Sequence, residues 1–294
     1  MITGTLLAIF SGFLYSITNI IDKFVVSKHI PKPIIMTIII SLFIGLVGLI
    51  YLPFTEIVAV GHLLILFISS CLSFAACLIY FEVIKYEEPS RIVPLFSFIT
   101  IFITILGAIF LGEIFSLITY IGIGIILAGA WTISSKRNIL SPFTSRFFGL
   151  MVLCSFLWAV NYVLLKYLVD QYPVSTIIAY DFIFHGAIAI VLLLFFYRSF
   201  IKFWQEKRKY VLIELISESI SIFAYYFFLL AASLWYVSLA SAVGTVQYLF
   251  VFLLAVILNK YRPGILDEQI NRRIMIQKII AIVLIIGGIF LISL

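Results

Sequence analysis

The sequence predicts an all-α, polytopic membrane protein with ten transmembrane helices arranged as two inverted repeats of five. Three observations support this prediction: an apolar composition, ten apolar segments of spanning length, and an internal sequence repeat. Of the 294 residues, 64% are hydrophobic and only 11% are charged. Soluble proteins are about one quarter charged. A chain with so few charges could not cover a water-exposed surface, so lipid must surround most of it.

The net charge of +6 does not indicate nucleic-acid binding. The basic residues lie in short loops between apolar segments, which is their usual place in membrane proteins. No cysteine or histidine cluster and no phosphate-binding or hydrolase motif appears. We therefore expect a small-molecule substrate and the lipid bilayer as partners, no nucleic acid, no cofactor or metal, and a monomer or homodimer that is not an enzyme.

A spanning helix needs about 20 mostly apolar residues. The segments are also too long and too uniformly apolar for the strands of a β-barrel. Pro94 lies inside the fourth segment, where we expect a kink that neighbouring helices tolerate. The ten predicted spans are approximately 3–25, 34–52, 62–84, 91–111, 117–134, 147–169, 174–197, 210–232, 238–258 and 274–294.

The loop charges predict an orientation. The connections 1–2, 3–4, 5–6, 7–8 and 9–10 lie on one side of the membrane. If Lys23 is assigned to the end of the first span, this side, including the adjoining span ends, holds 18 of the 19 Lys and Arg residues. Lys166 is the exception on the other side. The positive-inside rule then places these connections in the cytoplasm and both termini outside the plasma membrane.

An internal repeat relates the two halves. Residues 13–26 read FLYSITNIIDKFVV and residues 156–169 read FLWAVNYVLLKYLV, with four identities at an offset of 143 that include the pair Lys23 and Lys166. Each repeat then contains five spans. An odd number of spans forces the halves into opposite orientations, as in many secondary transporters. The predicted domains are residues 1–138 and 139–294.

The chain resembles the drug/metabolite transporter superfamily, specifically its EamA-like ten-helix members. The resemblance rests on the repeated opening, on EEPSRIVPLFSF (87–98), on LGE (111–113) before glycines Gly122, Gly124 and Gly129, and on SLASAVGTVQYLF in the ninth span. The second half ends this pattern with NKYRPG in place of GE.

This resemblance implies two EamA domains around a central cavity and transport by alternating access. Spans 1–4 and 6–9 would line the cavity, and spans 5 and 10 would lie at the periphery. Ten-helix relatives usually keep both termini in the cytoplasm, whereas the loop charges here favour the opposite orientation.

Charged residues within the spans should face the bundle interior, because each costs about 2.5–3.5 kcal/mol at the bilayer centre. Asp181 and His185 share one face of the seventh span, and Glu214 and Glu218 share one face of the eighth. We interpret Glu218 as a proton-coupling carboxylate with His185 as its partner. The alternative is a polar pair that only joins the two helices. Glu214 is expected at the interface near Lys207 to Lys209.

Other polar side chains complete the candidate site. Lys166 either snorkels to the nearest interface or, with Lys23, forms a cationic gate or substrate-carboxylate partner. The remaining candidates could hydrogen-bond or stack on a substrate; they are Asn19, Trp158, Asn161, Gln247 and Tyr248.

These features predict a secondary transporter that moves a small polar metabolite, such as an amino acid, and is proton-coupled or facilitative. A lipid- or nucleotide-linked sugar translocase of the same superfamily is the first alternative. The second is a membrane-embedded enzyme or scaffold that uses Asp181, His185, Glu214 and Glu218.

Overall fold

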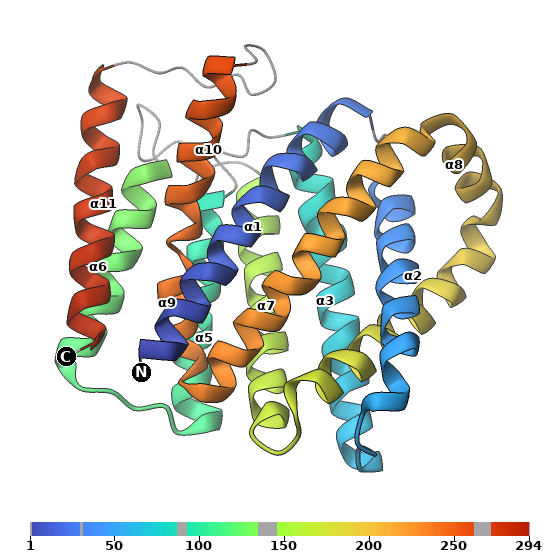
Figure 1. The fold of residues 1–294 in the computed structure, drawn as a ribbon, viewed down its shortest axis with the longest axis horizontal. Helices are drawn as coiled ribbons and strands as arrows, with labels where there is room; N and C mark the ends of the chain where they lie inside the picture. Colours follow the sequence, from blue (N-terminus) through green and yellow to red (C-terminus); the bar gives the residue numbers. More distant parts are fainter. Residues whose placement is uncertain (1, 30–31, 87–92, 135–145, 262–271, 294) are drawn as a thin grey trace.

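The computed structural model describes residues 2–29, 32–86, 93–134, 146–261 and 272–293, and within these ranges all regular structure is helical (Figure 1). The all-α prediction is therefore confirmed. The long helices are α1 (Ile2–His29), α2 (Pro33–Tyr51), α3 (Val60–Tyr86), α6 (Leu117–Ser134), α7 (Arg146–Val169), α8 (Val174–Leu234) and α11 (Arg272–Ser293). The shorter elements are η1 (Leu52–Phe54), η2 (Val93–Phe96), α5 (Ser97–Leu106), η3 (Gly107–Leu111), α9 (Val237–Gly244) and α10 (Gln247–Tyr261).

These elements cover the ten predicted spans. The fourth span consists of the 3-10 turn η2, helix α5 and the π-helical turn η3. The expected irregularity at Pro94 thus takes the form of a 3-10 turn; residues 87–92 of the EEPSRIVPLFSF motif lie outside the described residues. The ninth span was predicted as one helix, but it is divided into α9 and α10 at Thr245 and Val246.

Helix α8 supplies both the seventh and the eighth span. Its 61 residues would extend about 90 Å if straight, about three times the thickness of a bilayer core. The chain instead bends at Lys207, which has φ −123° and ψ 17°. The predicted loop Arg198 to Lys209 is therefore wrong in its secondary structure. This stretch contains neither glycine nor proline and is rich in Lys, Arg, Glu and Gln, which favour helix.

The two halves run in opposite directions. In Figure 1, α1 and α6 ascend, whereas their repeat counterparts α7 and α11 descend. The packing has the same two-fold pattern: α2 contacts the first part of α8, α6 contacts α11, and the pair α1–α8 matches the pair α7–α3. This arrangement confirms the inverted repeat.

Glycines permit the closest of these helix contacts. A Cβ atom on Gly45 of α2 would lie 2.5 Å from the Cα atom of Gly186 in α8. Between α6 and α11, a Cβ atom on Gly288 would lie 2.7 Å from the carbonyl oxygen of Gly122. Small residues allow transmembrane backbones to approach closely, because packing is the main attraction between helices in lipid. Each contact joins one repeat to the other.

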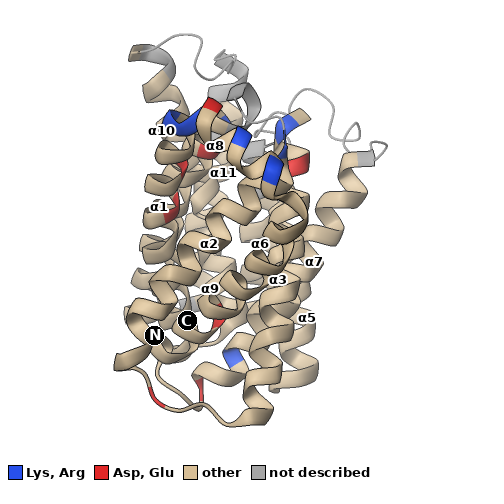
Figure 2. Cartoon of the chain, turned by 90° about the vertical axis from the view of Figure 1, so that its right-hand side faces the viewer, with Lys and Arg blue, Asp and Glu red and all other residues tan. Residues whose placement is uncertain are grey.

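The charges of the described residues are strongly polarised along the helix axes (Figure 2). Lys and Arg cluster at the end opposite the two termini. Lys166 is an exception, since it lies in the last turn of α7, which descends toward the end that holds the termini (Figure 1). This distribution is the one on which the predicted orientation rests, since both termini lie at the end that is poor in basic residues.

Candidate functional site

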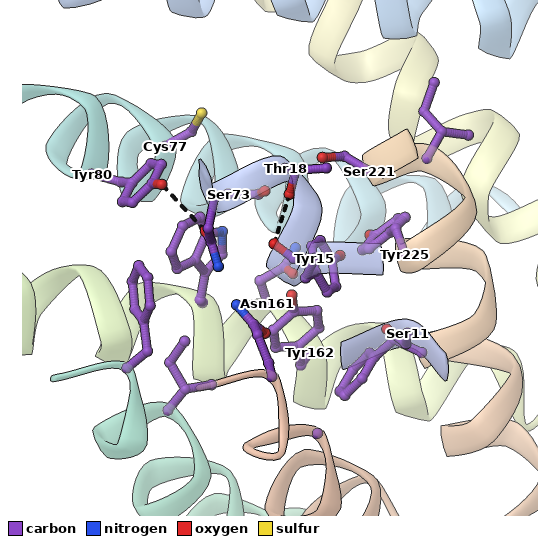
Figure 3. Close-up of a pocket in the computed structure, with 18 of the residues that line it drawn as sticks. Ser11, Tyr15, Thr18, Ser73, Cys77, Tyr80, Asn161, Tyr162, Ser221 and Tyr225 are labelled. Atoms are coloured by element: carbon purple, nitrogen blue, oxygen red, sulfur yellow. Dashed lines mark hydrogen bonds between the residues drawn. The ribbon is translucent and has the colours of Figure 1, made fainter. Parts of the chain in front are cut away.

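A cavity of about 250 Å³ lies between the two halves (Figure 3). Helices α1, α2, α3, α5, α7, α8, α9 and α10 contribute residues to its wall, as does η2, whereas α6 and α11 contribute none of the described lining residues. Spans 1–4 and 6–9 thus surround the cavity, and spans 5 and 10 are peripheral, as the resemblance implied. Cavities at the interface of inverted repeats are the usual binding sites of secondary transporters.

Eight of the ten predicted site residues line this cavity. They come from four different helices, so the fold brings together residues that are as much as 229 positions apart in the sequence. The eight are Asn19, Trp158, Asn161, Asp181, His185, Glu218, Gln247 and Tyr248.

The two lysines of the repeat do not line the cavity. Lys166 lies near the end of α7, where its Nζ atom is 2.6 Å from Oδ1 of Asp170 one turn later. Its ammonium group therefore pairs with a neighbouring carboxylate and does not face the cavity. Lys23 is a partly buried residue of α1 outside the lining set.

Asp22, which the sequence analysis did not select, is a central acidic residue of the site. Its Oδ1 atom accepts a 3.0 Å hydrogen bond from the Ser217 hydroxyl, and its Oδ2 atom lies 3.3 Å from the Tyr80 hydroxyl. The Glu214 carboxyl is within hydrogen-bonding reach of Asp22. Three side chains from α3 and α8 therefore converge on this residue of α1.

Glu214 is buried and not interfacial as predicted, because only 1% of it is exposed. Its Oε2 atom has no hydrogen-bond donor among the described residues. Two adjacent carboxylates repel each other unless one holds a proton, and a carboxylic acid can donate a hydrogen bond. A proton on Glu214 would both satisfy this group and let it donate to Asp22.

Asp181 is held as a hydrogen-bonded carboxylate at the cavity wall. Ser70 donates a 2.7 Å hydrogen bond to its Oδ1 atom, and Tyr225 donates a 2.9 Å bond to its Oδ2 atom. The residue is 2% exposed. Asp181 thereby connects α3 to both parts of α8, which combines a packing role with a negative charge beside the cavity.

His185 and Glu218 both line the cavity, but each has a different acidic neighbour. The neighbouring charge for His185 is Asp181, one helical turn away on α8, whereas for Glu218 it is Asp22 of α1. The Nδ1 atom of His185 is buried with no hydrogen-bond partner within the described part of the chain.

Neutral polar groups extend along the wall formed by α3 and α7. The Asn161 amide donates a 2.7 Å hydrogen bond to Ser69 Oγ, which fixes its orientation. Figure 3 shows Asn161 and the rings of Tyr15, Tyr162 and Tyr225 grouped around the cavity. The lining therefore combines hydroxyl and amide groups with aromatic faces, the usual composition of a small-molecule site.

The break between α9 and α10 lies at the cavity. Gly244, Thr245, Gln247 and Tyr248 all line it. A Cβ atom on Gly12 of α1 would lie 3.0 Å from the Gly244 carbonyl oxygen, so a glycine is required for α1 to pack against the break. The backbone stays hydrogen-bonded across this junction, because the N–H groups of Thr245 and Val246 donate to the carbonyl groups three residues earlier. The junction is therefore a locally tightened turn at the cavity and not an unwound segment.

Two inverted five-span halves around a central cavity are an architecture that many membrane transporters share. Comparison with known families agrees: a sequence model of the EamA-like transporter family matches residues 2–135 and 147–294. The chain belongs to the EamA-like transporter family and is therefore an integral, multi-pass membrane transporter of the drug/metabolite transporter superfamily.

A solved crystal structure shows the same fold. It superposes with a TM-score of 0.69 at 16% sequence identity, and the match covers 98% of this chain and 94% of the other. Among curated protein sequences, none matches this chain. The likeness at this low identity concerns the fold and not the substrate.

Proposed function

We propose that the protein is a secondary transporter that moves a small polar metabolite by alternating access and couples this movement to protons. The observation that carries the proposal is the cavity that both inverted halves enclose and that several polar and acidic side chains line. Two halves of opposite orientation can rock about such a site so that it opens to each side in turn.

The acidic residues support proton coupling. Glu218 lines the cavity, with Asp22 as its charged neighbour, and Asp22 is itself within hydrogen-bonding reach of Glu214. Tyr15 of α1 and Cys77 of α3 are the other titratable groups that face Glu218. A group of carboxyls too close for all to be ionised exchanges protons with its surroundings as its charge neighbours change.

The first alternative, a carrier of nucleotide- or lipid-linked sugars, is less well supported. Such substrates carry phosphates, which proteins bind with Arg, Lys or helix N-termini. None of the described lining residues is Arg or Lys, and three are acidic. The enzyme alternative lacks a specific supporting observation, since the members of the assigned family are transporters.

The test combines ligand identification with flux. Purified protein is screened by thermal shift against a metabolite library, and each hit is assayed for uptake into proteoliposomes with and without a pH gradient. We expect an imposed gradient to drive accumulation of a hit by the wild-type protein, and Glu218→Gln to abolish this accumulation while the variant remains folded.

A matched control separates coupling from general damage. Glu206 is an exposed carboxylate on the same helix, outside the cavity, so Glu206→Gln should retain gradient-driven uptake. Uptake by Glu218→Gln equal to that of the wild type at every pH would remove Glu218 from the mechanism. Absence of flux for all hits would contradict the transporter proposal itself.

A further inference from the structure

The charges that face the cavity have one sign. Three acidic residues line it, Asp22, Asp181 and Glu218, and no lysine or arginine is found among the described lining residues. His185 is the one residue in this described set that can become cationic, and it lies beside Asp181. The excess of negative groups favours a positively charged ligand and opposes an anion.

The hydrogen bonds fix how the acidic side chains are oriented at the cavity. Both oxygens of Asp181 accept bonds from hydroxyl donors, and Asp22 accepts from Ser217 and faces the Tyr80 hydroxyl. Hydroxyl donors of this kind stabilise the ionised form of a carboxyl group, whereas burial opposes it. A proton on Glu214 would let that residue act as a further donor to Asp22.

An aromatic cluster adjoins Asp22. The ring centroids of Tyr80, Phe96 and Trp158 are 5.4–6.0 Å apart from one another, and all three residues line the cavity. The Tyr80 hydroxyl connects this cluster to the Asp22 carboxylate. An ammonium group is attracted both to a carboxylate and to the faces of aromatic rings, and the second attraction is strongest where water is excluded.

We propose that the substrate of this site is a small organic cation, a primary or quaternary amine, whose ammonium group binds between Asp22, Glu218 and the cluster of Tyr80, Phe96 and Trp158. The assignment names the substrate class of the transporter proposed above and so rests on that function. A cavity of about 250 Å³ fits an amine of the size of choline or phenethylamine but not an extended conjugate.

The test is a binding assay that varies only the charge of the ligand. Isothermal titration calorimetry of the full chain in detergent compares phenethylamine with 2-phenylethanol, phenylacetate and phenylalanine, and choline with its neutral analogue 3,3-dimethyl-1-butanol. We expect at least one ammonium compound to bind, and its neutral, anionic and zwitterionic analogues to bind roughly tenfold more weakly or not at all.

Two substitutions localise the charge recognition. Asp22→Asn and Glu218→Gln should each weaken ammonium binding by roughly tenfold or more. Both variants should bind the neutral analogues with unchanged affinity. A misfolded variant would lose this binding as well, so the neutral analogues separate loss of charge recognition from loss of folding. The control Glu206→Gln keeps a carboxyl-to-amide change on α8 but lies outside the cavity and should bind like the wild type.

The binding and flux experiments test the substrate class and the transport function separately. Ammonium binding without flux in proteoliposomes would uphold the substrate class and contradict transport. Flux of a neutral or anionic metabolite, with no ammonium compound bound, would uphold transport and overturn the substrate class. Equal affinity for phenethylamine and phenylacetate, or unchanged ammonium affinity in both cavity variants, would also overturn it.

Discussion

Glu113 provides a sharp test of how the two halves are held together. Its carboxylate is only 2% exposed and accepts hydrogen bonds from the backbone N–H groups of Val237 at 2.9 Å and Ser238 at 3.1 Å. The Ser238 hydroxyl donates a third bond to the same carboxylate. A residue of the first half thus caps the N-terminus of α9 in the second half, where a negative charge also interacts favourably with the helix dipole.

The magnitude follows from these three bonds. A hydrogen bond to a charged group contributes about 1.5–3 kcal/mol, and a buried donor left without an acceptor costs about 1–3 kcal/mol. Glu113→Ala removes all three acceptor contacts and leaves two N–H groups in a site where Val237 and Ser238 are fully buried. We expect a loss of roughly 3–5 kcal/mol. Glu113→Gln keeps one acceptor oxygen and should lose about half as much.

The free energies of unfolding can be measured by titrating the detergent-solubilised protein with SDS and following its circular dichroism. Glu56→Gln is the control, because Glu56 is an exposed carboxylate in the connection between η1 and α3. Its change should stay within about 0.5 kcal/mol of zero. If Glu113→Ala is as stable as this control, or if Gln and Ala at this position are equally destabilising, the capping argument is refuted.

Two further predictions concern packing and orientation. Gly45→Leu should push α2 away from Gly186 and destabilise the protein by about 1–3 kcal/mol in the same SDS titration. Gly124→Leu is the control, because Gly124 is exposed and a Cβ atom there would have nothing within 4 Å. Equal effects of the two substitutions would contradict the packing argument. With single cysteines introduced as Glu56→Cys or Lys202→Cys, an impermeant maleimide should label the first in intact cells and the second only after permeabilisation. The reverse pattern would place the termini in the cytoplasm.

The apolar segments of the sequence predicted the spans but not their exact ends. The uncertain ends affected which acidic residues were assigned to the site and at what depth. Asp22 was overlooked because the first span was expected to end at residue 25, which placed Asp22 near the headgroups. Helix α1 continues to His29, so Asp22 lies at least one turn deeper. Glu214 was misplaced for the same reason, since the expected loop before it is part of α8. A carboxylate within an apolar segment was the available signal in both cases.

Glu113 could not have been assigned from sequence reasoning in the same way. It follows a span, in the LGE motif, where an acidic residue is usually exposed. Its partners lie 124 and 125 positions later in the chain. Only the packing of the two halves shows that this end of the fourth span meets the start of α9. The break after Gly244, by contrast, had a local signal, because glycine is a poor helix former.

The scaffold is two-fold symmetric, but the charge it encloses is not. At the repeat offset of 143, Asp22 of α1 corresponds to Leu165 of α7, which is fully buried. The pair α1–α8 holds Asp22, Glu214 and Glu218, whereas the matching pair α7–α3 is joined by neutral bonds such as that from Asn161 to Ser69.

The acidic group also lies toward one end of the path, because Glu214 follows the bend at Lys207 by seven residues, about 10 Å along the helix. Inverted halves can therefore exchange conformations while the ligand meets a different electrostatic environment on each side. Under the alternating access proposed above, this asymmetry would let the site bind its ligand on one side of the membrane and release it on the other.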